Sequence, residues 1–137
     1  MTGGAGYVGS VLIPKLINNG HKVKCLDRFF FGDEFLSQDQ FSEKLEIFHD
    51  DIRWFDPKLL DGVDAVLDLA AISNDPAGEL NPDKTFEINH MGRLRVAKLS
   101  KEHGVKRYIL ASSASIYGQQ EQIADEKSSV NPLTAYS

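Results

Sequence analysis

The chain has 137 residues, of which 42% are hydrophobic and 26% are charged, a composition that indicates one ordinary globular domain and excludes a disordered chain. The net charge of −5 argues against a nucleic-acid-binding surface, and no apolar run is long enough to span a bilayer. One cysteine, Cys25, allows no internal disulfide, so a reducing cytoplasm is the expected compartment.

Helices and strands are predicted to alternate along the chain. Apolar residues at helical spacing predict a first helix over Tyr7–Asn18, and Gly20 is the expected stop signal after it. Strands are expected over Lys22–Asp27 and Leu45–Phe48. The later predicted elements are a short helix over Trp54–Leu60, a buried strand over Ala65–Ala71, a long helix from Asn81 to about His103 and a buried strand over Arg107–Ala111. This order predicts an α/β fold, a doubly wound parallel sheet with helices on both faces.

A glycine-rich loop precedes the first predicted helix. Residues 2–9 read TGGAGYVG, which places Gly3, Gly6 and Gly9 three residues apart. Gly3 would permit a tight turn, Gly6 a close approach of the backbone to a pyrophosphate, and Gly9 close packing of the helix on the sheet. Free N–H groups at the helix N-terminus would then face phosphates. A glycine-rich turn without a ligand is the alternative for this stretch alone.

An acidic residue, Asp27, ends the strand that follows this helix. The order of loop, helix, strand and acid predicts a dinucleotide site in which Asp27 accepts hydrogen bonds from the adenosine ribose hydroxyls. The adjacent Arg28 would instead suit the 2′-phosphate of NADP. We expect NAD because Asp27 would repel that phosphate, and NADP is the alternative cofactor.

Three motifs together carry a resemblance to a known family: TGGAGYVGS at residues 2–10, LAA at 69–71 and SSASIYG at 112–118. Over its whole length the chain resembles the extended short-chain dehydrogenases/reductases, and within them the NAD-dependent nucleotide-sugar epimerase/dehydratase branch of the UDP-glucose 4-epimerases. The resemblance implies a Rossmann-like fold, NAD as cofactor and a nucleotide-sugar substrate.

The resemblance also implies that residues 1–137 are part of an NAD(P)-binding domain. Most of the first, central strand would precede Thr2, and the C-terminal substrate-binding region would be absent. We therefore expect this chain to be a fragment that folds poorly and has no turnover when produced alone.

Cofactor contacts are implied by the resemblance in several segments. Asp51–Ile52 would flank the adenine ring, Leu69–Ala71 would lie along the cofactor at a strand end, and Asn89 would hold the backbone of the site. The full implied set is Gly3, Gly6, Tyr7, Val8, Asp27, Arg28, Asp51, Ile52, Leu69, Ala70, Ala71 and Asn89.

The resemblance places Ser113 and Tyr136 on the catalytic serine and tyrosine of the family. The tyrosine would take the proton of a sugar hydroxyl as hydride passes to the nicotinamide, and Ser113 would orient the substrate oxygen. A tyrosine acts as such a base only when its pKa lies well below about 10, and in the family a lysine four residues later lowers it. That position, 140, lies past Ser137. Ser73 is a candidate substrate contact, although a plain turn is equally expected there.

Other functions stay open beside an epimerase. A 4,6-dehydratase would carry acids in a stretch like Thr-(Asp/Glu)-Glu-Val-Tyr-Gly, whereas SASIYG at 113–118 has none. An NADP-dependent sugar or ketone reductase would use Arg28. A non-catalytic dinucleotide sensor, the alternative of another class, would lack the lysine at position 140. No metal site is expected, because none of the four histidines has metal-ligand spacing.

The predicted long helix carries apolar residues on more than one side, namely Phe86, Ile88, Met91, Leu94, Val96 and Leu99. A helix that packs only on a sheet needs one apolar stripe. Burial on two sides implies a second neighbour, which in the resembling family is the helix of a partner subunit. We therefore expect a homodimer, with neither a membrane nor a nucleic acid as partner.

Overall fold

A computed structural model describes residues 1–137 except 33, 35, 37–40 and 42. In chain order the elements are α1 (Tyr7–Asn18), β1 (Val23–Asp27), β2 (Leu45–His49), the 3-10 turn η1 (Pro57–Leu60), β3 (Ala65–Asp68), α3 (Asp75–Leu80), α4 (Pro82–Phe86), the π-helical η2 (Glu87–Gly92), α5 (Arg93–Glu102), β4 (Arg107–Leu110) and the 3-10 turn η3 (Ala114–Tyr117). None of the helices in the described ranges is both long and apolar enough to cross a membrane.

All strand pairs of the sheet are parallel. β1 pairs with β2, and β3 pairs with β4. The segment Met1–Gly3 joins the two pairs, because Thr2 forms parallel bridges to both Leu26 and Asp68. The Thr2 N–H donates to the carbonyl of Leu67 at 3.0 Å, and the Leu26 N–H donates to the carbonyl of Met1 at 2.9 Å. The N-terminal segment therefore occupies the centre of the sheet, and the predicted doubly wound parallel fold is confirmed.

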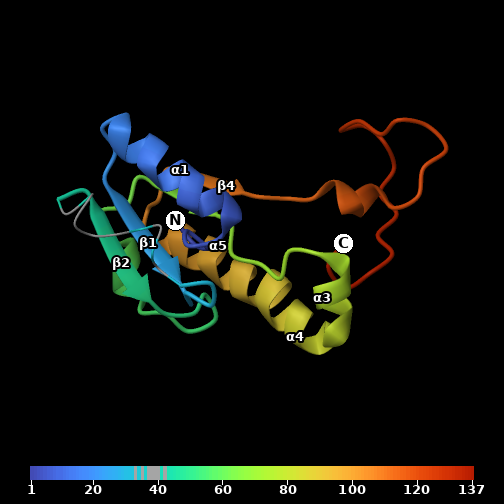
Figure 1. The fold of residues 1–137 in the computed structure, drawn as a ribbon, viewed down its shortest axis with the longest axis horizontal. Coiled ribbons are helices and arrows are strands. Elements are labelled where there is room, and N and C mark those ends of the chain that lie inside the picture. Colours follow the sequence, from blue (N-terminus) through green and yellow to red (C-terminus); the bar gives the residue numbers. More distant parts are fainter. Residues whose placement is uncertain (33, 35, 37–40, 42) are drawn as a thin grey trace.

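Two hydrophobic cores lie on opposite faces of the sheet because successive side chains of β1 point to opposite sides. Cys25 packs with Ile13 and Ile17 of α1 in one core. Its neighbour Leu26 packs with Val96 of α5 in the other. Helices therefore cover both faces, as Figure 1 shows, and the carboxyl ends of the strands are left to build a site.

The predicted long helix is confirmed as a continuous helical run through α4, η2 and α5. Asn81 caps its start, because its side chain accepts a hydrogen bond from the Lys84 N–H. A Cβ at Gly92 would lie 2.9 Å from side-chain atoms of Ile52, so glycine brings this helix close to the segment after β2. The π-helical stretch, which the apolar pattern did not reveal, contains the predicted site residue Asn89.

Two expectations about elements are wrong or incomplete. The helix expected over Trp54–Leu60 is reduced to the turn η1, since Asp56 and Pro57 start it three residues late. The strand over Arg107–Ala111 was expected to be buried, but β4 exposes Ile109 and Leu110 by 54% and 51%, because it pairs only with β3 in the described part of the chain.

The long helix is buried on one side only. Val96 is in the core, whereas Phe86, Met91 and Leu94 are exposed. The two-sided burial expected from the sequence therefore does not arise within this chain.

Candidate functional site

The candidate site includes a tight turn at Gly3, which lies directly against the end of β3. Gly3 has a φ of +66°, and a Cβ there would be 2.6 Å from the backbone nitrogen of Ala70. Both the backbone conformation and the contact with Leu69 and Ala70 therefore require glycine. The structure brings two predicted cofactor segments, the glycine loop and Leu69–Ala71, into contact.

The same loop contains one required glycine that the sequence analysis missed. A Cβ at Gly4 would lie 2.4 Å from the Sγ of Cys25, so this glycine lets the loop sit on β1. The prediction that Gly9 packs the helix on the sheet needs correction: a Cβ at Gly9 would meet the carbonyl oxygen of Gly4 at 2.4 Å. Gly9 therefore packs the helix on the loop, which itself lies between helix and sheet.

Gly6 is less constrained by the fold than these glycines. Its φ of −75° and ψ of 175° suit any residue, and a Cβ would have one tight contact, at 3.3 Å from the Gly3 carbonyl oxygen. Gly6 precedes the first turn of α1, which no side chain of the described residues caps, and Tyr7 after it is 93% exposed. Open N–H groups beside a missing Cβ form a cradle that fits a phosphate group.

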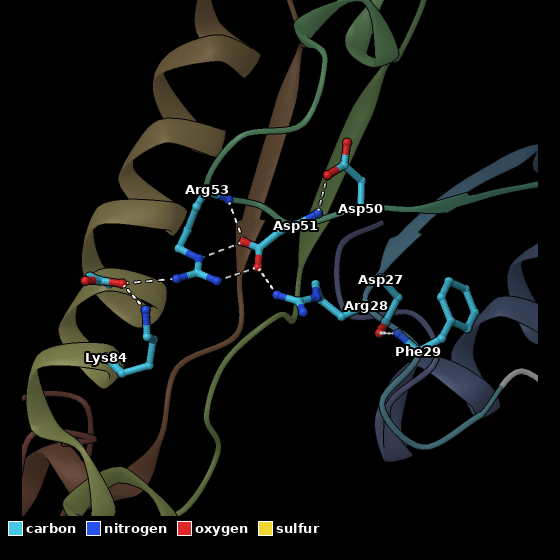
Figure 2. A network of polar contacts seen from close by, with 8 residues as sticks. Asp27, Arg28, Phe29, Asp50, Asp51, Arg53 and Lys84 are labelled. Atoms are coloured by element: carbon cyan, nitrogen blue, oxygen red, sulfur yellow. Dashed lines mark hydrogen bonds and ion pairs between the residues drawn. The ribbon is translucent and has the colours of Figure 1, made fainter.

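The acid predicted for the ribose, Asp27, is held beside this loop. Its Oδ2 accepts a hydrogen bond from the Ala5 N–H at 2.9 Å, and its Oδ1 accepts one from the Phe29 N–H at 2.8 Å. Figure 2 shows the second of these bonds. The loop and the acid, which are far apart in sequence, therefore form one side of a single site.

Asp51 lies at the centre of an ion-pair network on the other side of Asp27 (Figure 2). Arg28 donates to its Oδ2 at 2.8 Å, and Arg53 donates through Nε to Oδ1 at 2.9 Å and through a terminal nitrogen to Oδ2 at 2.8 Å. Arg53 also donates to Glu87 of the long helix at 3.0 Å. The Asp51 side chain is only 6% exposed. The predicted adenine-flanking residue is thus paired with two arginines.

The pKa of the Asp51 carboxyl is held well below its usual range. Burial alone would raise this pKa, but hydrogen bonds from the Arg53 side chain and backbone and from Arg28 outweigh burial. The charged carboxylate is therefore the form that the folded protein stabilises.

This depressed pKa predicts a pH-dependent difference in stability between the intact protein and its Asp51→Asn variant. The native contribution of the carboxylate is complete above the unfolded-state pKa of about 4 and is lost as the pH falls toward the lower folded-state pKa. In urea unfolding at several pH values, the wild type should therefore exceed the variant most above about pH 5, and the difference should shrink below about pH 4. A difference that stays constant down to pH 3 would contradict this role of Asp51.

The side chain of Asn89 forms hydrogen bonds with the backbone of the neighbouring segment, as the resemblance implies. Its Oδ1 accepts a hydrogen bond from the Ile72 N–H at 2.8 Å, and its Nδ2 donates to the Ile72 carbonyl at 2.9 Å. The asparagine thus fixes the segment that follows Leu69–Ala71. Ser73, next in the chain, is exposed in the turn before α3.

The two predicted catalytic side chains lie on different segments. Ser113 precedes η3, and its Oγ accepts a hydrogen bond from the Ser115 N–H at 3.2 Å. Tyr136 lies against α3, where a Cβ at Gly78 would be 3.1 Å from the tyrosine Cβ. Figure 1 shows the chain after β4 extending away from the sheet before it returns to α3. Within the described residues no hydrogen bond joins Ser113 to Tyr136.

Below the glycine turn lies a buried polar cluster that the sequence analysis did not recognise. Asp68 is fully buried and accepts hydrogen bonds from the Thr2 hydroxyl at 2.5 Å and from the Tyr108 hydroxyl. Arg93 approaches the same carboxylate at 3.5 Å and donates to the carbonyls of Asp68 at 2.9 Å and of Ala111 at 2.6 Å. Burial and the Asp68 carboxylate raise the pKa of Tyr108. In the sequence, the one signal for this cluster was a single acidic residue, Asp68, within an otherwise apolar predicted strand.

Comparisons with known proteins match this architecture. A family model described as "NAD dependent epimerase/dehydratase family" matches residues 1–137. The UDP-glucuronic acid decarboxylase 1 of Danio rerio is 36% identical over 137 residues, which cover 97% of this chain and 32% of the relative. The chain therefore spans about a third of the length of this curated relative.

Solved structures agree closely in fold. The UDP-N-acetylglucosamine 4-epimerase from Methanobrevibacter ruminantium M1, in complex with UDP-N-acetylmuramic acid, has a TM-score of 0.91 at 29% identity, covering 98% of this chain and 44% of that one. The UDP-glucose-4-epimerase from Stenotrophomonas maltophila, with bound NAD and formylated UDP-arabinopyranose, has a TM-score of 0.87 at 28% identity, covering 98% and 43%.

Proposed function

The chain belongs to the NAD dependent epimerase/dehydratase family, and we propose that its glycine loop and Asp27 bind NAD. The resemblance seen in the sequence to the nucleotide-sugar epimerase/dehydratase branch is thereby confirmed. The observation that carries the proposal is the cradle at the start of α1, where Gly6 leaves open the space that a Cβ would fill. Such a cradle suits a pyrophosphate, and Asp27 beside it suits the ribose hydroxyls.

The remaining implied residues would surround the rest of the cofactor. Leu69–Ala71 lies against Gly3, so it would follow the cofactor away from the pyrophosphate. Asn89 would support this segment through Ile72. Bound NAD would supply the hydride-accepting chemistry of the reaction.

In the intact protein, Tyr136 would take the proton of a sugar hydroxyl and Ser113 would orient that hydroxyl. The substrate we propose is a nucleotide sugar, since the two similar solved structures are complexes with UDP-linked sugars. We propose a 4-epimerase because residues 113–118 carry no acid that would assist the elimination of water. The decarboxylase among the relatives is an activity that the sequence analysis did not consider.

Product analysis separates these activities. The intact protein would be incubated with NAD and either UDP-glucose or UDP-glucuronic acid. An epimerase converts UDP-glucose into its 4-epimer with no net production of NADH, so the expected product is UDP-galactose. Release of CO2 from UDP-glucuronic acid, or formation of a 4-keto-6-deoxy sugar, would contradict the epimerase assignment while retaining the family.

A second copy of the protein is the partner we propose for the exposed side of the long helix. Phe86, Met91 and Leu94 are 55%, 58% and 38% exposed in this chain. The intact protein should therefore have a dimeric mass by light scattering, and a monomeric mass would contradict this partner. The cytoplasm remains the proposed compartment, on the argument from the single cysteine.

A further inference from the structure

Two residues with opposite cofactor preferences stand side by side at the end of β1. An acid at the position of Asp27 binds the 2′-hydroxyl of NAD, whereas an arginine nearby accommodates the 2′-phosphate of NADP. This chain has both, because Arg28 follows Asp27 directly. Which preference prevails therefore depends on whether the Arg28 guanidinium is free to bind a phosphate.

The Arg28 guanidinium is already engaged in the structure. It donates to Asp51 at 2.8 Å and lies 4.7 Å from the centre of the Phe30 ring. Its side chain is 43% exposed, whereas that of Asp51 is 6% exposed, so the fixed member of the pair is the carboxylate. Figure 2 shows the Arg28 side chain turned toward Asp51.

The carboxylate is itself fixed by a second arginine. Arg53 makes three hydrogen bonds to Asp51, from its backbone N–H, its Nε and a terminal nitrogen. Arg53 is also bonded to Glu87, so it stays anchored on the long helix if Asp51 is changed. Arg28 has no such second acid: among the described residues its only ion pair is the one with Asp51.

We propose that Asp51 is a determinant of cofactor specificity, which favours NAD over NADP by holding the Arg28 guanidinium in an ion pair. This inference rests on the proposed function, since it concerns the same cofactor site. Arg28 and Asp51 line a hollow of about 270 Å³ together with His49, Asp50 and Trp54, so a displaced guanidinium has space in which to move. Without the carboxylate, Arg28 would carry an uncompensated charge next to the ribose position, where a 2′-phosphate attracts it.

The test measures dissociation constants of NAD and NADP by calorimetry on the intact protein. In the Asp51→Asn variant, the ratio of the NADP constant to the NAD constant should fall by about tenfold, the size expected for freeing one charge-assisted hydrogen bond. The ratio is the informative quantity because a contact between Asp51 and adenine would alter both constants equally.

Asp50→Asn is the matched control. It removes the same charge from the same hollow, but Asp50 is bonded to the Asp51 N–H and not to Arg28. Its ratio should stay within about twofold of the wild type, since screening weakens charge effects without direct contact. Equal ratios in the two variants would overturn the proposal.

Arg28→Ala supplies two further tests. Added to Asp51→Asn, it should return the ratio to the wild-type value, and a gain in NADP affinity that persists without Arg28 would overturn the proposal. The single variant Arg28→Ala leaves Asp51 unchanged. Its ratio should change less than about twofold, because the guanidinium is already bonded to Asp51. If Arg28→Ala strongly raised the dissociation constant of NADP and left that of NAD unchanged, the proposal would be overturned. A wild type that binds neither cofactor would overturn the proposed function as well, whereas an unchanged ratio in Asp51→Asn overturns only this inference.

Discussion

Tyr136→Phe in the intact protein is expected to lower kcat by about 100- to 10,000-fold, the usual contribution of a positioned proton acceptor. The substitution removes only the phenolic oxygen, which would take the hydroxyl proton of the sugar. The dissociation constant of NAD should change by less than about twofold, because removing one hydroxyl leaves the phosphate cradle and Asp27 intact. Turnover of the nucleotide sugar and a separate calorimetric titration with NAD measure the two effects.

Tyr117→Phe is the matched control for this variant. It makes the same chemical change in η3, close in sequence to Ser113, at a tyrosine that the resemblance does not assign to catalysis. Its kcat should stay near the wild-type value. Normal turnover in Tyr136→Phe, or equal losses in both variants, would remove Tyr136 from the proposed chemistry.

Asp68→Ala is expected to give the largest loss of stability, about 3–5 kcal/mol in the free energy of unfolding. The substitution leaves the Arg93 guanidinium and the hydroxyls of Thr2 and Tyr108 without their shared acceptor inside the sheet. These groups cannot all recover hydrogen bonds to water at a site where Asp68 is fully buried. Urea unfolding monitored by circular dichroism measures the loss.

Asp64→Ala is the control for Asp68→Ala. Asp64 is also paired with a cation, Lys106, at 2.8 Å, but both side chains are largely exposed. Its stability should therefore stay close to that of the wild type. Comparable losses in the two variants would mean that burial of Asp68 is not what makes its network important.

Local sequence patterns were sufficient where a structure depends on neighbours along the chain. The helix predicted over Tyr7–Asn18 has the observed bounds, and the parallel pairing of the strands followed from the alternation of elements. The glycine loop and Asp27 were also recognised, because each has a fixed place relative to the first helix. The structure adds the contact between them, a hydrogen bond from the Ala5 N–H to Asp27.

What the sequence did not reveal depends on contacts between distant segments. The partners of Asp68 come from the N-terminal segment, from α5 and from β4, and no periodicity connects those positions. The pairing of Asp51 with Arg28 likewise arises only when the ends of β1 and β2 meet. Gly4 was missed because its requirement comes from the Cys25 side chain on the neighbouring strand.

The central claim, that the start of α1 holds the pyrophosphate of NAD, is tested most directly by calorimetric titration of the intact Gly6→Ala protein with NAD. Gly20→Ala, just past the other end of α1, is the control, since a Cβ there meets no atom within 4 Å. The added methyl at Gly6 should weaken NAD binding by about tenfold or more because it fills the cradle, and its 3.3 Å contact with the Gly3 carbonyl should lower the melting temperature only slightly. Gly20→Ala should lower the melting temperature slightly, since its φ is +90°, and leave NAD binding unchanged. Wild-type NAD affinity in Gly6→Ala would contradict the account.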